Sequence, residues 1–242
     1  MVQIGFKCNK GIVRKNNEDA CFVIPSHDVY IVADGVGGNN SGEVASRTAV
    51  SEIAQFVNEN DLSICRTPED IFEFFADAIE TANEKIYRMG REIEANRGMA
   101  TTIVLAYIRD KKAYISNIGD SRAYLFRKGR LKRLTEDHTY VNELIQKGVI
   151  TEDEAENHKQ KNVITRALGA EHFADPDFYK VNLSENDVLM LCSDGLYGEI
   201  DETEIAEILR REKSMNDLCS TLVDEAIQAG GRDNITVVCI KI

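Results

Sequence analysis

The segment Val29-Tyr30-Ile31-Val32-Ala33-Asp34-Gly35 decides the fold, because an uninterrupted apolar run ends there in an acidic residue and a glycine. Short apolar runs that end in a turn signal are typical of strands buried in a core. Asp120 and Asp194 likewise follow apolar runs, and Asp233 lies just before the run that begins at Ile235. The pattern therefore predicts core strands that each carry a carboxylate at one end.

The rest of the chain alternates strand and helix patterns in blocks. Hairpin signals join 101–108 to 112–118 and 123–127 to 130–134, so part of the sheet is predicted to be antiparallel. This block order favours an α+β layered sandwich over a wound βαβ fold. The predicted strands are 20–24, 29–33, 101–108, 112–118, 123–127, 130–134, 177–183, 188–192 and 235–240. One predicted helix begins at Ser41. Three others cover 68–95, 202–211 and 216–229, and short helices are predicted within 139–160.

The composition argues against several classes of protein. The 242 residues carry 29 Lys and Arg against 41 Asp and Glu, a net charge of −12, which gives the chain little attraction for nucleic acid or anionic lipid. No apolar stretch approaches the ~20 residues of a membrane helix, and no signal peptide is visible. The six cysteines form no Cys-x-x-Cys pair, so we expect reduced thiols in a cytoplasmic protein. No linker divides the chain, so we expect one domain over residues 1–242.

The aspartates at the predicted strand ends suggest a metal site. Strand ends of a sandwich converge at one rim, where several carboxylates would repel one another unless a divalent cation lay between them. Oxygen-only ligands select Mg²⁺ or Mn²⁺ over zinc. The alternative is that each aspartate, with its neighbouring glycine, only forms a turn. That alternative explains any one position better than it explains all of them together.

The segment Arg14-Lys15-Asn16-Asn17-Glu18-Asp19 is a second candidate for function. An arginine can hold phosphate oxygens in a bidentate fork, and Glu18 or Asp19 could add to the metal site. The alternative interpretation is a solvated polar loop before a strand.

Taken together, these segments resemble the metal-dependent protein phosphatases (the PPM family, or type 2C Ser/Thr phosphatases) in their short bacterial form. The resemblance covers essentially the whole chain, in the family's order and rough spacing. The matching stretches are Gly11–Arg14 with Asn17–Asp19, Ala33–Gly38, Thr101-Thr102, Asn117–Arg122, Leu134–His138, Thr165–Gly169, Cys192–Leu196 and Gly231–Thr236.

The resemblance implies a four-layer αββα sandwich, in which two mainly antiparallel sheets are flanked by helices and two Mn²⁺ or Mg²⁺ ions lie between the sheets. Asp34 would bridge both ions, and Asp194 and Asp233 would hold the first. The carbonyl of Gly35 would bind the second ion, which Glu18 would reach through water.

The resemblance also implies that Arg14 binds the substrate phosphate and that Asp120, with Asp194, holds a third ion. Residues from about 140 to 176 would form a flap beside the site. The implied reaction is hydrolysis of phosphoserine and phosphothreonine by direct attack of a hydroxide that bridges two metals, without a phosphoenzyme. The implied partners are phosphorylated proteins, in opposition to a Ser/Thr kinase, for a protein expected to be a monomer.

Two positions depart from the family's pattern. Val36 stands where many eukaryotic members have a histidine that is proposed to protonate the leaving group, so a metal-bound water is the candidate acid here. Ala100, before Thr101-Thr102, stands where glycine is frequent.

Two other functions fit parts of the sequence. Cys8 and Arg14 have the Cys-x5-Arg spacing of cysteine-dependent phosphatases, but Lys15 replaces the usual Ser or Thr, and an apolar strand follows instead of a helix. A pseudophosphatase that only binds phosphoproteins would require a broken metal set, whereas all the aspartates are present. The four histidines are interpreted as structural, with His138 as a hydrogen-bonding residue.

Overall fold

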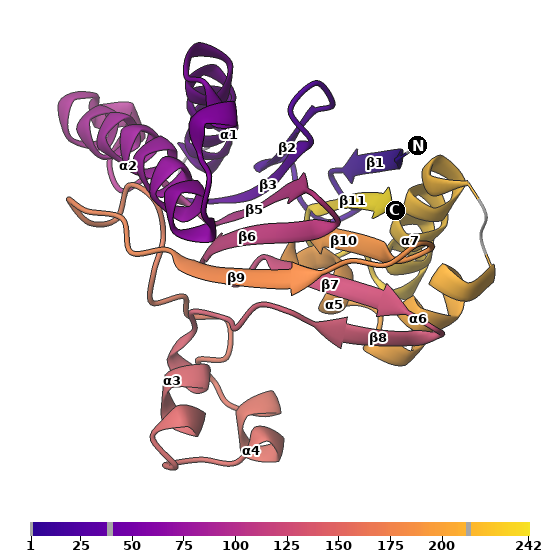
Figure 1. Ribbon diagram of the computed structural model, residues 1–242. Helices are drawn as coiled ribbons and strands as arrows, with labels where there is room; N and C mark the ends of the chain where they lie inside the picture. The colour runs from indigo at the N-terminus through magenta and orange to yellow at the C-terminus, as the bar shows by residue number, and fades with distance from the viewer. Residues whose placement is uncertain (1, 38–40, 212–213) are drawn as a thin grey trace.

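The computed structural model describes residues 2–37, 41–211 and 214–242. Gly38, the last residue of one of the motifs, lies outside the described residues. Two sheets lie face to face, with helices on both outer sides (Figure 1). Every strand pair of the described chain is antiparallel. The architecture is therefore the four-layer αββα sandwich predicted from the sequence.

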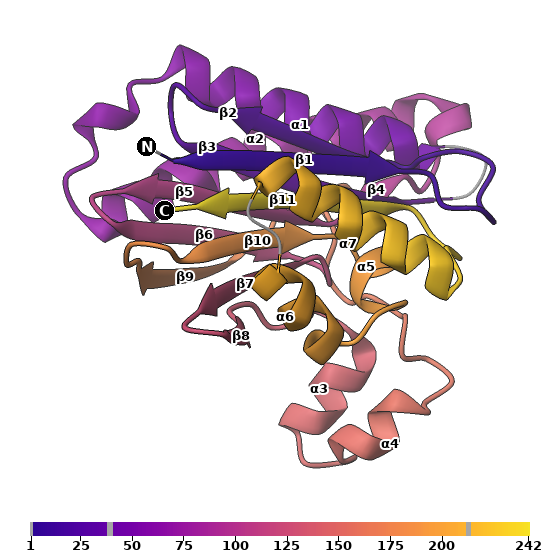
Figure 2. The same ribbon diagram turned by 90° about the vertical axis from the view of Figure 1, so that its right-hand side faces the viewer.

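Each sheet mixes strands from distant parts of the chain. In spatial order, the first sheet consists of β1 (Gln3–Asn9), β11 (Ile235–Lys241), β10 (Val188–Cys192), β7 (Arg122–Arg127) and β8 (Arg130–Arg133). The second consists of β2 (Asp19–Ile24), β3 (Val29–Val36), β5 (Ile103–Arg109), β6 (Lys112–Ile118) and β9 (Asp177–Asn182), with β4 (Ala100–Thr101) paired to β3. Strands from the two ends of the chain thus lie side by side, as β1 and β11 do (Figure 2).

The helices cover the two outer faces. Helices α1 (Ser41–Glu59) and α2 (Pro68–Glu92) lie over the second sheet, and α5 (Asp194–Tyr197), α6 (Glu202–Arg211) and α7 (Met215–Ala229) lie over the first (Figures 1 and 2). Thr67 begins α2 with a capping box: Asp70 N–H donates to Thr67 Oγ1, and Asp70 accepts from Thr67 N–H. Short 3-10 helices η1 (Leu62–Ile64) and η2 (Glu94–Asn96) flank α2.

The central strands are buried on both faces. In β3, Val29, Ile31 and Ala33 pack against the helices, whereas Tyr30 and Val32 face the other sheet. Strands β10 and β11 alternate in the same way between the helix side and the sheet side. This double burial explains why these strands are continuous apolar runs rather than alternating ones.

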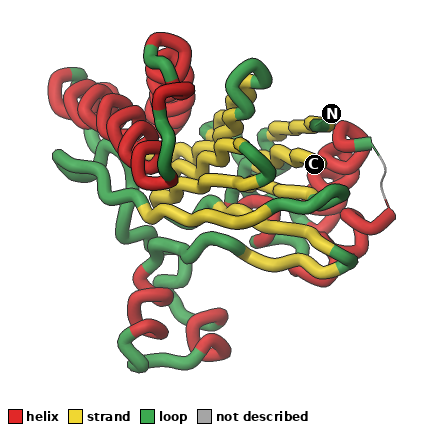
Figure 3. The backbone as a smooth tube through the Cα atoms, viewed as in Figure 1, coloured by secondary structure: helices red, strands yellow, loops and turns green. Residues whose placement is uncertain are grey.

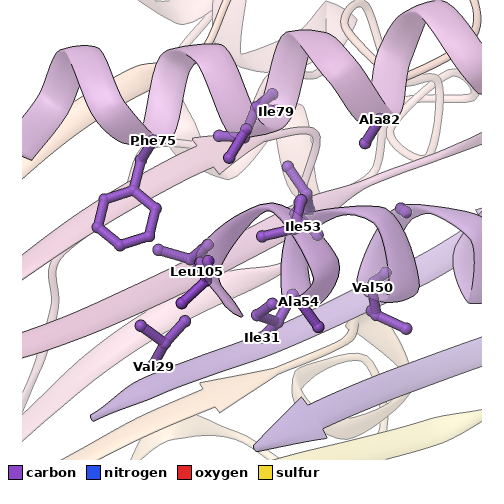
Figure 4. Close-up of a cluster of buried hydrophobic side chains, with 14 of the residues drawn as sticks. Val29, Ile31, Val50, Ile53, Ala54, Phe75, Ile79, Ala82 and Leu105 are labelled. Carbon is purple, nitrogen blue, oxygen red and sulfur yellow. The ribbon is translucent and has the colours of Figure 1, made fainter. Parts of the chain in front are cut away.

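Figure 4 shows the layer between α1, α2 and the second sheet. Ile53 of α1 and Phe75 and Ile79 of α2 approach Ile31 and Leu105 of the strands beneath them. All five side chains have no exposed surface. This contact fixes the helices on the sheet whose strand β3 carries Asp34.

One long connection leaves the sandwich. Between β8 and β9 the chain is mostly loop, apart from α3 (Tyr140–Gln146) and α4 (Glu152–Glu156) (Figure 3). These two helices project away from both sheets (Figures 1 and 2). In the described ranges, no helix has both the length and the apolar character needed to cross a membrane.

The sequence patterns miss strand β1. Only Gly5 of this edge strand is buried, so no apolar alternation marks it. Gly5 lies tightly against α7, where an added Cβ would come within 2.1 Å of the Met215 carbonyl oxygen. An edge strand that packs through a glycine carries almost no periodic signal.

Three predicted boundaries are wrong. Strand β3 continues past Ala33 to Val36, because its last residues pair with β4. The predicted strand 101–108 is interrupted at Thr102, whose N–H donates to the carbonyl of Asp34 instead of continuing the ladder. Helix α2 ends at Glu92, because Ile93 adopts an extended conformation.

We expect Ile53→Ala to lower the free energy of unfolding by about 2–5 kcal/mol, because it leaves a cavity between α1 and the sheet. Ile64→Ala, at a side chain that is 66% exposed, should change it by less than about 0.5 kcal/mol. Urea denaturation followed by circular dichroism measures both variants. Equal losses for the two would contradict the packing described here.

Candidate metal centre

Strand β3 presents Asp34 through a fixed backbone. The N–H of Asp34 donates to Thr102 Oγ1 at 3.0 Å. Its carbonyl accepts from Thr102 N–H at 2.8 Å and from Thr101 Oγ1 at 2.9 Å. Because three hydrogen bonds hold the main chain, the carboxylate has little freedom beyond its own side-chain rotations.

Two loops of the first sheet bring Asp194 and Asp233 to the same place. Asp194 is the first residue of α5, directly after β10. Gly195 lies against the residue that follows Asp233, since a Cβ there would come within 2.0 Å of the Asn234 carbonyl oxygen. Backbone therefore packs on backbone at this point, which a residue larger than glycine would prevent.

Asn234 holds the N-terminal loop beside these aspartates. Its Nδ2 donates to the carbonyls of Lys10 and Asn16 at 2.8 and 2.9 Å. Its Oδ1 accepts from the N–H of Glu18 at 2.7 Å. One buried side chain thus fixes both ends of the loop that carries Arg14.

Gly35 lies where the N-terminal loop, β3 and α1 meet. Its N–H donates to the Glu18 carbonyl at 3.0 Å. A Cβ at Gly35 would come within 2.1 Å of the Gly42 carbonyl oxygen and 2.6 Å of the Glu18 carbonyl oxygen. Only glycine permits this close approach of main-chain oxygens.

Burial, and then mutual repulsion, raises the pKa values of the gathered carboxylates. Burial and then the charge of Asp233 raise the pKa of Asp194 to about 6, against a hydrogen bond with Asp34. Burial raises the pKa values of Asp120 and Asp19 to about 7, and the charge of Asp194 adds to both shifts. The pKa of Asp34 lies well above its ordinary value, through burial and then the charges of Asp19, Asp194 and Asp120. Without a cation, this cluster therefore retains protons near neutral pH.

Arg14 supplies the nearest positive charge. Its Nη2 lies 2.6 Å from Oδ2 of Asp233, with the two side chains 53% and 34% exposed. This hydrogen bond raises the pKa of the Arg14 guanidinium. Burial raises the pKa of Glu18, and the charge of Arg14 opposes that shift. Arg14 is thus a half-exposed counter-charge beside the carboxylate cluster, to which the charge of Arg122 also contributes.

The donor chemistry fits hard divalent cations. The clustered side chains offer only carboxylate oxygens, which Mg²⁺ and Mn²⁺ prefer. Throughout 2–37, 41–211 and 214–242, no three His, Cys, Asp or Glu side chains already converge into a metal-ligand set. Instead, Asp194 is hydrogen-bonded to Asp34, and Asp233 is paired with Arg14. Their oxygens suit the ions, while the spacing of the ligands would have to adjust.

A cavity of about 1150 Å³ opens beside the cluster. Asp120, Asp194 and Asp233 line it on one side, and side chains between residues 139 and 162 line it on another. The projecting segment with α3 and α4 therefore forms one wall of the space in front of the carboxylates.

The structure places Asp34, Asp120, Asp194 and Asp233 within electrostatic reach of one another. Arg14 and Glu18 lie near Asp233, and Gly35 is hydrogen-bonded to Glu18. The structure also adds residues to the site. Thr102 and Asn234 hold the backbone that carries Asp34 and Arg14, and Tyr197 donates from its hydroxyl to the carbonyl of Asp120 at 2.8 Å. Their only signal in the sequence is their place within or beside the quoted motifs.

Comparison with known proteins agrees with this geometry. The Protein phosphatase 2C family matches residues 4–235 of the chain. The chain is similar to the protein phosphatase PhpP of Streptococcus pneumoniae, at 38% identity over 243 residues, 99% of this chain and 97% of PhpP. The serine/threonine phosphatase of S. agalactiae has a similar structure, with a TM-score of 0.93 at 35% identity over 100% of both chains.

A further similar structure is that of the catalytic domain of the phosphatase PstP in complex with 2 manganese ions. Its TM-score is 0.87 at 30% identity, over 99% of this chain and 97% of that one. The chain therefore belongs to the protein phosphatase 2C family, the metal-dependent serine/threonine phosphatases. The resemblance read from the motifs is confirmed.

We expect the metal-free protein to lose stability as the pH rises from 5.5 to 8. The folded pKa values of Asp194, Asp120 and Asp19, about 6 to 7, lie above the ~3.9 of an unfolded aspartate. Protonation therefore favours the folded state, and that stabilisation disappears as the pH rises through 6 to 7. We expect Tm in EDTA to fall by roughly 5 °C or more across this range.

Saturating Mn²⁺ should remove this fall, because the ion binds the deprotonated carboxylates. The Asp120→Asn variant should show a shallower fall in EDTA, which separates the cluster from the histidines. A Tm in EDTA that stayed constant from pH 5.5 to 8 would contradict the mutual repulsion.

Proposed function

We propose that the protein hydrolyses phosphoserine and phosphothreonine in proteins by direct attack of an activated water, without a phosphoenzyme. The observation that carries this proposal is the group of partly buried carboxylates beside an open cavity, with Arg14 at its edge. Such a group is costly to fold and serves as a ligand set for cations. Membership of the protein phosphatase 2C family supports the same reaction.

The residues that would hold the ions follow from their positions. Asp34 would bridge two ions, Asp194 and Asp233 would hold the first, and the carbonyl of Gly35 would bind the second, which Glu18 would contact through water. The structure of PstP with 2 manganese ions supports this count and Mn²⁺ as the ion, with Mg²⁺ as the alternative. When bound, the ions would supply a water activated near neutral pH and positive charge for the phosphoryl oxygens.

Asp120 would contribute, with Asp194, to a third ion. Asp120 is 8% exposed and lines the cavity together with Asp194. Burial and then the charge of Asp194 raise the pKa of Asp120, so the two carboxylates face the same space and a cation between them would relieve their repulsion.

Arg14 would bind the substrate phosphate. A divalent ion on Asp233 would replace Arg14 as its counter-charge, which leaves the guanidinium fork for two phosphoryl oxygens. Since a phosphate monoester carries roughly two negative charges, Arg14 would both orient it and offset its charge.

The projecting segment would act as the flap. Residues 140–176 would cover the cavity in a domain that spans 1–242, and the phosphoprotein would enter between them and the sandwich. We propose that the substrates are phosphorylated by a Ser/Thr kinase, and that the protein acts in the cytoplasm as a monomer in signal transduction.

The structure disfavours Cys8 as a nucleophile. Its Sγ accepts from Asn17 Nδ2 at 3.0 Å and lies 2.9 Å from Thr236 Oγ1. Burial raises the pKa of the Cys8 thiol, whereas a nucleophilic cysteine needs a lowered pKa. A pseudophosphatase would need a defective carboxylate group, whereas Asp34, Asp120, Asp194 and Asp233 are all present in the sequence.

We expect hydrolysis of p-nitrophenyl phosphate and of a phosphothreonine peptide to stop in EDTA and to return with Mn²⁺ or Mg²⁺. Asp233→Ala should lower the rate by roughly a hundredfold or more, because a metal ligand is lost. Asp224→Ala, at an exposed position of α7, and Cys8→Ser should keep the wild-type rate. Activity that persists in EDTA would rule out the metal mechanism, and a folded, metal-loaded but inactive protein would favour a pseudophosphatase.

We expect Arg14→Ala to lower kcat/KM for the phosphopeptide by roughly 10–100-fold, since hydrogen bonds to charged groups are worth about 1.5–3 kcal/mol. The Mn²⁺ concentration for half-maximal activity should stay equal or fall, because Asp233 loses its competing partner. Lys15→Ala removes the same charge one residue away, at an exposed position, and should leave kcat/KM unchanged. A loss of metal affinity in Arg14→Ala would contradict this role.

A further inference from the structure

The turn that carries Asp120 is held on both sides by the two-residue segment Asp137-His138. On one side, Gly119 N–H donates to His138 Nδ1 at 3.1 Å, and Gly119 O accepts from His138 N–H at 2.9 Å. On the other side, Asp137 binds Arg122 in a bidentate pair, with Nε to Oδ1 at 2.9 Å and Nη2 to Oδ2 at 2.6 Å. The segment therefore holds the residues on both sides of Asp120.

Tyr197 of α5 adds two further contacts to this turn. The Arg122 guanidinium lies 3.5 Å from the centroid of the Tyr197 ring, a cation–π contact. The Tyr197 hydroxyl donates to the carbonyl of Asp120 at 2.8 Å. None of these contacts uses the Asp120 carboxylate, so they hold the main chain of the turn and not the acid group itself.

These contacts are needed to keep Asp120 in place. The charge of Asp194 repels Asp120, and both groups are largely buried. A freely moving Asp120 would turn away from Asp194 and relieve the repulsion. The backbone has no such freedom, because Gly119 adopts φ +98 with Thr102 packed against it, where a Cβ would lie 2.6 Å from Thr102 Cγ2.

We propose that Asp137 and His138 are positioning residues that hold Asp120 against Asp194, so that the two carboxylates can share one divalent ion. This inference rests on the proposed function, which assigns Asp120 to a third ion. It adds the residues that make this site possible, neither of which contacts the ion.

The two ring nitrogens of His138 separate the positioning role from a general structural one. Because Nδ1 accepts from Gly119, the proton is assigned to Nε2, which lies 3.2 Å from Asp177 Oδ2. An Asn side chain can present an acceptor near the place of Nδ1, whereas a Gln side chain reaches toward Asp177 but offers no acceptor to Gly119. His138→Asn therefore removes the contact with Asp177, and His138→Gln removes the hydrogen bond with Gly119.

The chain offers a matched control for Asp137. Asp187 binds Arg127 with the same bidentate distances, 2.9 and 2.6 Å, away from the carboxylate cluster. Asp137→Asn and Asp187→Asn thus remove the same charge from the same kind of ion pair. Only the first borders the Asp120 turn.

The experiment is Mn²⁺ titration of the metal-free protein by isothermal titration calorimetry, with Tm recorded for each variant. Asp137→Asn and His138→Gln should raise Kd for the weakest-bound ion by roughly 10–100-fold, the usual effect of losing a residue that orients a ligand. His138→Asn and Asp187→Asn should stay within about threefold of wild type. The tighter ions should bind all four variants equally.

Three results with the variants would overturn the inference. The first is that Asp137→Asn and His138→Gln both bind the weakest ion as the wild type does. The others are an equal loss of affinity for this ion in His138→Asn and His138→Gln, and an equal loss in Asp137→Asn and Asp187→Asn. A wild-type protein that binds only two ions and hydrolyses phosphopeptide also overturns it, with the proposed function intact. A wild-type protein that binds no Mn²⁺ and has no activity fails the proposed function itself.

Discussion

Repulsion among carboxylates at the meeting ends of two sheets is the constraint on which the rest of this structure depends. Asp34 comes from one sheet, Asp194 and Asp233 from loops of the other, and their negative charges would separate them in a flexible chain. They stay together because every strand end that carries them is held by main-chain hydrogen bonds and by glycine contacts without room for a Cβ. The fold thus stores an electrostatic cost that cations can remove.

The four layers provide the rigidity that this cost requires. A one-residue slip of a strand that is buried on both faces would move every side chain into the opposite layer, where it would not fit the neighbours packed there. The register that aligns Asp19 with Asp34 across β2 and β3 is therefore fixed by packing on both sides of the sheet.

Elements with a regular pattern of apolar residues could be predicted from the sequence, whereas elements without such a pattern could not. Runs such as Val29–Ala33 are continuous because both faces are buried, so their strands and the aspartates after them could be predicted. Strand β1 could not, because an edge strand packed through Gly5 has no periodic pattern. Thr102, Asn234 and Tyr197 act through hydrogen bonds to backbone that is distant in the sequence, and no local pattern of residues predicts such contacts. The extension of strand β3 to Val36 also depends on its pairing with β4, which lies far along the sequence.

The charge distribution explains how an acidic protein can act on an anion. The chain carries a net charge of −12, and several carboxylates gather at the proposed phosphate site. The Arg14 guanidinium alone does not offset this negative charge, because it is paired with Asp233. In the proposed function, divalent ions would neutralise the carboxylates and would also release Arg14 from Asp233 toward the phosphate. Substrate binding would then depend on metal binding, since one arginine cannot pair with the aspartate and the phosphate at the same time.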